Sequence, residues 1–349
     1  MPNATATRQS YWELWKVTAA ERLVRANGLS VSLRPMATIP SSPVTGGPVA
    51  EVDRFDVPTL IRRYQDEAGL DVTPYLQSLA TLPLYDCRDT GYRFFHPPAL
   101  AGEAEFYDLI WQAENRSQHR PEDLWRDDWQ FALDRLKPGE RVLDVGCAEG
   151  IFLSRAVKIA EVEGIDGNPE GARIAAAKGL PVRCSTVSEF ADQHAGQFDK
   201  VVSFQVLEHI YDVATFVGGL KALVRPGGRI ILSVPNSEPY YAGWAKYEPL
   251  NNPPHHIGLW NERSLRKMAE FFALRIVEVH YLGVPDRFSL QVYRLAAYFA
   301  GVFKPPNRIT RSDFLKIMLS APRAILQVAR ARLSRSKEHY AYVAIVLEK

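Results

Sequence analysis

Residues 141–153 read RVLDVGCAEGIFL, and this stretch decides the fold. The apolar run at 141–143 predicts a buried strand, and the helix-compatible run at 154–157 follows it. Between them, Gly146 and Gly150 allow the backbone to turn tightly and to approach a ligand closely. A strand that passes through a glycine turn into a helix holds nucleotide-like cofactors at the C-terminal edge of a parallel sheet. We therefore expect a cofactor site at this turn, although D-x-G-x-x-x-G alone is only a modest signal.

A second predicted strand, at 162–166, ends in an acid. Asp166 lies twenty-two residues after Asp144. At the tip of this strand its carboxylate can accept hydrogen bonds from two ribose hydroxyls. Apolar strands then alternate with helical segments, which predicts a parallel sheet covered on both faces. The further expected elements are strands at 181–184, 198–204 and 229–236 and a helix at 213–224.

These segments together resemble the class I S-adenosylmethionine-dependent methyltransferases. The type most similar includes the ubiquinone-biosynthesis O-methyltransferases and many bacterial small-molecule and saccharide methyltransferases. The resemblance covers 138–283 and the last dozen residues, about half of the chain. It implies a Rossmann-like α/β fold with a seven-stranded sheet, whose last strand, at 340–347, is antiparallel beside a sixth strand at 275–281. The motifs that carry it, in the family's order and spacing, are LDVGCAEG at 143–150, GID at 164–166, FD at 198–199, VLEH at 206–209 and RPGG at 225–228.

The resemblance implies S-adenosyl-L-methionine as the cofactor and a set of residues to bind it. Ala148 stands where many members carry a further glycine, and because alanine favours a negative φ the turn should be less free there. Thr186 stands where many members have an acid that reads the adenine amine, and a hydroxyl is a weaker acceptor than a carboxylate. The expected cofactor-binding residues are Asp144, Gly146, Cys147, Gly150, Asp166, Gly167, Thr186, Val187 and Gln205.

Methyl transfer to an oxygen also requires removal of a proton, and histidine is the usual base. His209 follows the fourth predicted strand, and His255 and His256 lie in a proline-stiffened loop after the fifth, so all three fall on the edge that holds the cofactor. These side chains could serve as base, orient the acceptor or only order the loop, and Glu208 with His209 could cap a turn. The expected catalytic residues are His255, His256, His209 and Glu208, no metal is expected, and His280 is assigned a structural role.

The segment 42–98 contains SPVTG at 42–46 and CRDTG at 87–91, which resemble two knuckles of a zinc ribbon found in some methyltransferases of this type. Only Cys87 provides a thiolate, so a metal-free β-module is expected. The predicted organisation is an appendage and linker at 1–41, this degenerate zinc-ribbon-like module at 42–98, an aromatic helical lead-in or lid at 99–137, the methyltransferase core at 138–283, a basic helical insertion at 284–337 and the last core strand at 338–349.

The insertion 284–337 carries eleven Lys and Arg residues against two acids, a balance of +9, while the whole chain has a net charge of +2. Apolar residues recur in it at helical spacing, as in 314–319 and 325–333. Basic amphipathic helices can lie on anionic membranes. They can equally cap a substrate site with their apolar face, which is the interpretation that we favour for a helical insertion.

Composition limits the remaining possibilities. Three cysteines at wide spacings do not form a disulfide framework, which favours a reduced, cytoplasmic compartment. No signal peptide or transmembrane run is recognised, although peripheral membrane contact stays open. The core shows no basic groove with interleaved aromatic residues, so a nucleic-acid partner is not expected. The expected acceptor is a small molecule, a saccharide or a lipid-linked group methylated on oxygen; the alternatives are C- or N-methylation and a non-catalytic cofactor-binding scaffold.

Overall fold

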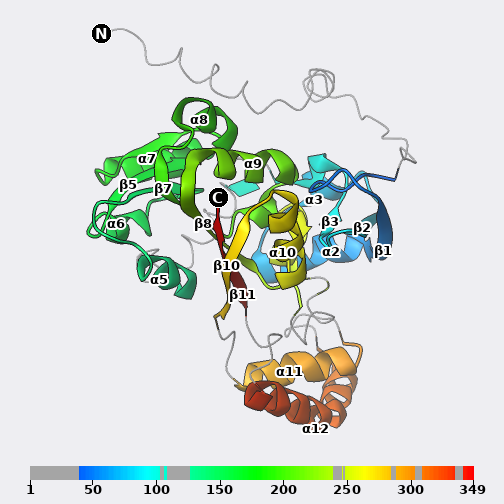
Figure 1. Cartoon of the computed structure of the whole chain (residues 1–349). Coiled ribbons are helices and arrows are strands. Elements are labelled where there is room, and N and C mark those ends of the chain that lie inside the picture. Colours follow the sequence, from blue (N-terminus) through cyan, green and yellow to red (C-terminus); the bar gives the residue numbers. More distant parts are fainter. Residues whose placement is uncertain are drawn as a thin grey trace, which may run out of the picture. The chain divides into compact units, whose positions relative to one another are not determined.

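The computed structural model describes residues 39–102, 106–107, 126–238, 246, 248–283, 288–302, 309–334 and 341–349. The chain divides into residues 1–38 and 39–349, and only the second unit contains described residues (Figure 1). Residues 1–38 of the predicted appendage and more than half of the aromatic lead-in lie outside the described residues.

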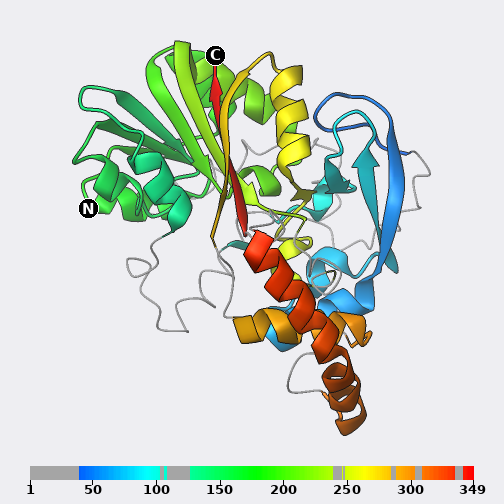
Figure 2. The ribbon, with the colours of Figure 1, turned by 60° about the horizontal axis from the view of Figure 1, so that its bottom comes forward.

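A seven-stranded sheet forms the centre of the fold, with strand order β10-β11-β8-β7-β4-β5-β6. Its middle strands are parallel, and β11 runs antiparallel between β10 and β8 (Figure 2). The predicted Rossmann-like sheet with an antiparallel last strand is therefore confirmed. The strands are β4 Arg141–Val145, β5 Glu161–Asp166, β6 Val182–Cys184, β7 Phe198–Phe204, β8 Val224–Pro235, β10 Arg275–Leu282 and β11 Tyr342–Glu348.

Both faces of this sheet are buried, which explains why its strands read as nearly continuous apolar runs. Along β11, Val343 and Ile345 belong to one hydrophobic cluster and Ala344 and Val346 to another. Because successive side chains of a strand point to opposite faces, the two clusters are the cores on the two sides of the sheet. The helices are α5 Asp127–Leu133, α6 Leu153–Ala156, α7 Pro169–Ala177, α8 Val187–His194, α9 Val213–Leu223 and α10 Glu262–Phe271, with the single turn η5 Leu207–His209 after β7.

The N-terminal module forms a second, antiparallel sheet of order β1-β2-β3-β9. Its fourth strand comes from the loop that follows β8, so a distant part of the chain completes it. The close fit requires a glycine, since a Cβ on Gly258 would lie 2.1 Å from the Tyr92 hydroxyl. The elements of this region are β1 Val49–Asp56, α2 Val57–Arg63, η2 Tyr64–Ala68, α3 Thr73–Leu76, β2 Thr81–Cys87, β3 Arg93–Phe95, η3 Pro98–Leu100, η7 Pro249–Asn251 and β9 Gly258–Leu259.

The two degenerate knuckles meet in this module. Ser42, Cys87 and Thr90 are all buried. Burial raises the pKa of the Cys87 thiol to about 11, and hydrogen bonds from Ser42 and Thr90 act against that rise. Hydroxyl groups thus surround the remaining thiol in place of further thiolates. The expectation that this module binds no zinc stays a prediction.

The insertion contains two helices, α11 Phe288–Phe299 and α12 Arg311–Ser334, which pack on each other. Their shared core includes Leu295, Ile317 and Val328. In the ranges that the structure describes, no helix has the length and apolar character needed to cross a bilayer.

Candidate cofactor and acceptor site

The glycine turn after β4 has the conformation that its sequence predicts. Gly146 and Gly150 have φ values of 80° and 75°, a region that favours glycine. The amide of Gly146 donates to the carbonyl of Ile165 at 2.8 Å, which joins the turn to β5. A Cβ on Gly146 would also lie 2.4 Å from Cγ2 of Val206. Both the backbone conformation and the packing therefore exclude a side chain at this position.

One expectation for this turn needs correction. Ala148 has φ of 45°, so the alanine does adopt the left-handed conformation that we expected it to avoid. Its amide donates to Oδ2 of Asp166 at 2.7 Å, and this bond offsets the backbone strain. The helix that follows, α6, has only four residues. Asp166 and the turn, rather than a long helix N-terminus, therefore shape this edge.

Two acids face this edge, of which Asp144 is buried and Asp166 is partly exposed. Asp166 accepts from the amides of Ala148 and Asn168, and burial nevertheless raises its pKa. Burial, and then the nearby Asp166, raise the pKa of Asp144 to about 8. Oδ1 of Asp144 is buried and has no hydrogen-bond partner among the residues described. A ligand that brings hydroxyl donors and positive charge, as S-adenosylmethionine does, fits this pair of desolvated acids.

The other expected cofactor residues lie along the neighbouring strand ends. Thr186 is the N-cap of α8, and its hydroxyl already accepts from the amide of Glu189. Gln205 follows β7 with φ of 56°, and its Nε2 lies 3.3 Å from Oγ of Ser233. Cys147 and Val187 are buried, and Gly167 follows β5. The contact of these residues with a cofactor stays a prediction.

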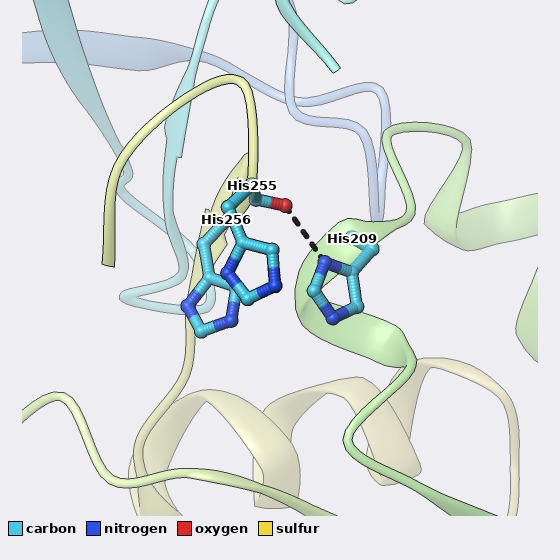
Figure 3. A group of neighbouring side chains, drawn as sticks. All are labelled: His209, His255 and His256. Carbon is cyan, nitrogen blue, oxygen red and sulfur yellow. Dashed lines mark hydrogen bonds between the residues drawn. The ribbon is translucent and has the colours of Figure 1, made fainter. Parts of the chain in front are cut away.

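The four predicted catalytic residues come together although they lie on two separate segments. Glu208 and His209 are in the turn η5, and His255 and His256 lie between η7 and β9. Nδ1 of His209 is 2.7 Å from the carbonyl of His255 (Figure 3) and 3.0 Å from the Tyr107 hydroxyl. Because a carbonyl oxygen only accepts, Nδ1 carries the proton and Nε2 of His209 has a free lone pair.

Burial controls the charges in this cluster. It raises the pKa of Glu208 to about 8 and lowers that of His209 to about 3. Burial and the neighbouring His209 and His255 place the pKa of His256 well below its usual value. His209 and His256 are therefore neutral at physiological pH, with nitrogen lone pairs available to bind a ligand.

The N-terminal module holds the loop that carries His255 and His256. The Tyr64 hydroxyl donates to the carbonyl of Asn252 at 2.6 Å, and the amide of Phe95 donates to the carbonyl of Ile257. On the other side, the amide of Ile257 donates to the carbonyl of Glu208. The loop is thus held between the N-terminal module and η5. The sequence gives no sign that these two distant segments contact the same loop.

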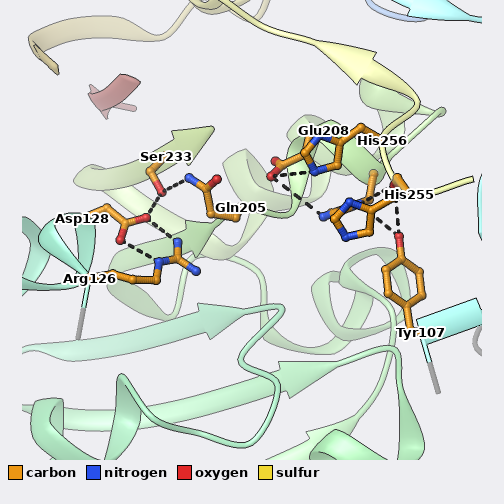
Figure 4. A network of polar contacts seen from close by, with 9 residues as sticks. Tyr107, Arg126, Asp128, Gln205, Glu208, Ser233, His255 and His256 are labelled. Atoms are coloured by element: carbon orange, nitrogen blue, oxygen red, sulfur yellow. Dashed lines mark hydrogen bonds and ion pairs between the residues drawn. The ribbon is translucent and has the colours of Figure 1, made fainter. Parts of the chain in front are cut away.

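Sequence reasoning missed a second polar network. Asp128 in α5 is completely buried, pairs with Arg126 and accepts from Ser233, which in turn contacts Gln205 (Figure 4). The single signal in the sequence was an acid within an aromatic, helix-like segment. This network fixes the residues at the ends of β7 and β8. His280, assigned a structural role, is on β10 and pairs with Glu278.

Comparison with known proteins agrees with this geometry. Residues 117–279 match the family described as Methyltransferase domain. The ubiquinone biosynthesis O-methyltransferase of Aromatoleum aromaticum is 39% identical over 120 residues, 32% of this chain and 50% of that protein. The protein of the same name from Xanthomonas oryzae pv. oryzae is 34% identical over 154 residues, 42% of this chain and 64% of that protein. A SAM-dependent methyltransferase from Archaeoglobus fulgidus has a TM-score of 0.50 at 17% identity, with 70% of this chain and all of that chain covered.

The family match and the sheet topology together identify residues 117–279 as a methyltransferase domain of the class I S-adenosylmethionine-dependent type. The match to the Archaeoglobus fulgidus structure supports the fold alone, because the identity is low. The chain spans about half the length of the curated relatives that it matches most strongly.

Proposed function

We propose that the protein transfers the methyl group of S-adenosyl-L-methionine to an acceptor bound beside the histidine residues. The observation that carries this proposal is the pair of desolvated acids, Asp144 and Asp166, at a glycine turn on the C-terminal edge of the sheet. The cofactor would supply a methyl group activated on sulfonium. Asp166 would bind its ribose, and Gly146 would leave room for its close approach.

We call the part of the site formed by Glu208 and the three histidine residues the acceptor side, because the methyl acceptor would bind there. His209, His255 and His256 with Glu208 would orient the acceptor and remove its proton. Val206, which packs on Gly146, lies two residues before Glu208, so the same turn joins the cofactor side to the histidine side. We propose oxygen as the atom methylated, in a small molecule, saccharide or lipid-linked group, because the matched relatives are named as O-methyltransferases. C- or N-methylation and cofactor binding without catalysis are the alternatives.

Titration with S-adenosylhomocysteine tests the cofactor proposal. Asp166→Ala removes a charge-assisted acceptor and should weaken binding by about 1.5–3 kcal/mol, or roughly 10–150-fold in Kd. Asp192→Ala, which removes an exposed acid of α8, is the control and should leave Kd unchanged. Equal affinity in all three proteins would remove Asp166 from the site, and no binding by the wild type would overturn the proposal.

We also propose that α12 contacts an anionic membrane surface. On one side Ile317, Ala324 and Val328 pack against α11. At 100° per residue the opposite side of the helix is apolar and exposed, and it includes Leu315, Leu319 and Leu326. Lys316, Arg323 and Arg330, each exposed and seven residues apart, form one row along the edge of that face. An apolar face bordered by cations suits an anionic bilayer. The cap over the substrate site stays the alternative.

Sedimentation with vesicles tests this proposal. The wild type should bind vesicles rich in phosphatidylglycerol but not vesicles of phosphatidylcholine, and binding should weaken with salt. Leu319→Glu with Leu326→Glu should abolish binding. Phe271→Glu, at an exposed ring of α10, is the control and should not. Absence of vesicle binding by the wild type, or a change of oligomeric state in the double variant, would argue for the cap or for a second copy instead.

A further inference from the structure

Three imidazole rings lie close together on this edge of the sheet. One nitrogen of each of His209, His255 and His256 lies within 4.8 Å of a nitrogen of the others (Figure 3). His256 is buried, and the other two are partly exposed. We call these three residues the histidine cluster. Neutral imidazole is the commonest metal ligand in proteins.

The Glu208 carboxylate points towards the histidine cluster but forms no hydrogen bond with His209 or His256. Its Oε1 lies 3.8 Å from Nε2 of His209 and 4.0 Å from Nε2 of His256, beyond hydrogen-bond distance. Its Oε2 is buried and has no hydrogen-bond partner in the described part of the chain. A buried carboxyl group left without partners costs free energy. Two imidazole nitrogens and one carboxylate oxygen therefore converge without satisfying one another.

The orientation of the His209 ring is already fixed through Nδ1, the nitrogen farther from Glu208. Nδ1 donates to the carbonyl of His255, and the Tyr107 hydroxyl is within hydrogen-bond distance of the same nitrogen. A hydrogen bond that holds the distal nitrogen of a histidine is the usual support for a metal ligand, because it sets the tautomer and the ring orientation. It leaves Nε2, the atom nearest Glu208, free to coordinate.

We propose that His209, His256 and Glu208, with His255 as a third imidazole, bind one divalent transition-metal ion such as Zn²⁺. Zinc binds histidine nitrogen at about 2.0–2.1 Å and carboxylate oxygen at about 2.0–2.2 Å, so tetrahedral donors lie roughly 3.4 Å apart. The separations of 3.8 and 4.0 Å between Glu208 and the two imidazoles need to shorten by about half an ångström, and those between the imidazole nitrogens, at most 4.8 Å, by up to about 1.4 Å. The His255 ring is stacked on that of His256 at 4.5 Å, so it must turn to coordinate.

This site departs from the expectation of no metal in the sequence analysis. Ion binding itself does not depend on methyl transfer, whereas a role for the ion rests on the proposed function. An ion on this edge would hold an acceptor hydroxyl and make its proton easier to remove. The histidine residues would then act as ligands, and proton removal would not require a free imidazole base.

Metal uptake by full-length protein, freed of affinity tag and dialysed against chelator, tests the site. Calorimetry with Zn²⁺ and visible absorption with Co²⁺ should show one ion per chain. His209→Ala, His256→Ala and Glu208→Gln should each weaken uptake by more than the roughly 10–100-fold that follows loss of an outer-shell partner. Cys87→Ser and His280→Ala are controls that should bind as the wild type does.

The outcomes separate the two proposals. No uptake by the wild type, or uptake that His209→Ala and His256→Ala leave unchanged, overturns the metal site, and so does its loss in Cys87→Ser, which would place the ion in the N-terminal module. S-adenosylhomocysteine titration of the same proteins shows whether each variant is folded. Cofactor binding without metal uptake would refute the metal site alone; metal uptake without cofactor binding would refute the methyltransferase proposal alone.

Discussion

The two halves of the sheet edge are built in different ways. On the cofactor side, the amides of Gly146 and Ala148 donate to the Ile165 carbonyl and the Asp166 carboxylate, within the one segment that runs from β4 through α6 to β5. On the acceptor side, the histidine cluster and Glu208 come from two loops, and the N-terminal module fixes the second of these through Tyr64. The first half therefore depends on backbone conformation, and the second on side chains positioned by distant contacts. Substitutions should separate the two.

The largest expected effect is on turnover and lies on the acceptor side. His209→Ala, His255→Ala and His256→Ala should lower kcat, by roughly 10²–10⁴-fold for a base or an essential ligand, because each removes a neutral imidazole from the cluster. Their Kd for S-adenosylhomocysteine should stay near the wild-type value. Steady-state kinetics with an identified acceptor, beside cofactor titrations, measures both. Wild-type kcat in all three variants over about pH 6–9 would end the catalytic role.

The next largest effect lies on the cofactor side, where substitutions should lower stability and cofactor affinity. Gly146→Val should cost about 2–5 kcal/mol through left-handed strain and the contact with Val206, and cofactor binding should be lost with it. Gly139→Val is a matched control, since Gly139 also has φ of 80° but no atom lies within 4 Å of the place that a Cβ would take there. It should show only the strain, about 1–2 kcal/mol in the free energy of unfolding. Equal cofactor affinity in both variants would contradict the close-approach argument.

A third prediction concerns the pH dependence of stability without cofactor. Asp144 has a folded pKa of about 8 and an ordinary unfolded value, so between pH 5 and 8 the unfolded state has released a proton that the folded state retains. Stability should therefore fall as pH rises, by about 2–4 kcal/mol from this group, and Asp144→Asn should remove that share. Urea denaturation at pH 5 and pH 8 measures the difference.

Asp199 is the control, because its effect on stability should change with pH in the opposite direction. Hydrogen bonds from the Arg141 amide and then from Arg225 lower its pKa, so its contribution is present above the unfolded pKa and is lost as pH falls through the folded one. Asp199→Asn should therefore lower stability at pH 8 and leave the decline from pH 5 to 8 in place. An equal pH slope in wild type and Asp144→Asn would contradict the assignment to Asp144.

The smallest effect tests whether the N-terminal module supports the acceptor side. Tyr64→Phe removes one of three donors to the carbonyl of Asn252, which keeps the amides of His255 and His256, and should cost about 1 kcal/mol in unfolding free energy, with a modest fall in kcat and no change in cofactor affinity. Tyr92→Phe is the matched control, because the buried Tyr92 hydroxyl has no partner among described residues and its removal should be neutral or stabilising. Thermal denaturation of both variants decides between them.

The sequence predicted the fold and the glycine turn well because their signals are local. Glycine spacing, an acid at the tip of the next strand and alternating apolar segments specify a backbone path within a few dozen residues. The bounds of β7 agree with the prediction, whereas β8 begins five residues earlier, at Val224, because it continues through the RPGG turn. The left-handed Ala148 was missed, because the bond to Asp166 that stabilises it joins residues eighteen apart.

By itself, the sequence determined the class of fold, the glycine turn and the identity of the candidate histidine residues. Only the tertiary structure decided how those side chains meet: that β9 completes the N-terminal sheet, that the Tyr107 hydroxyl reaches His209, and that Glu208 is buried beside two imidazoles. The physical reason is that backbone conformation follows from neighbouring residues, while burial, and with it the pKa of Glu208 and His209, depends on every segment that excludes water from them.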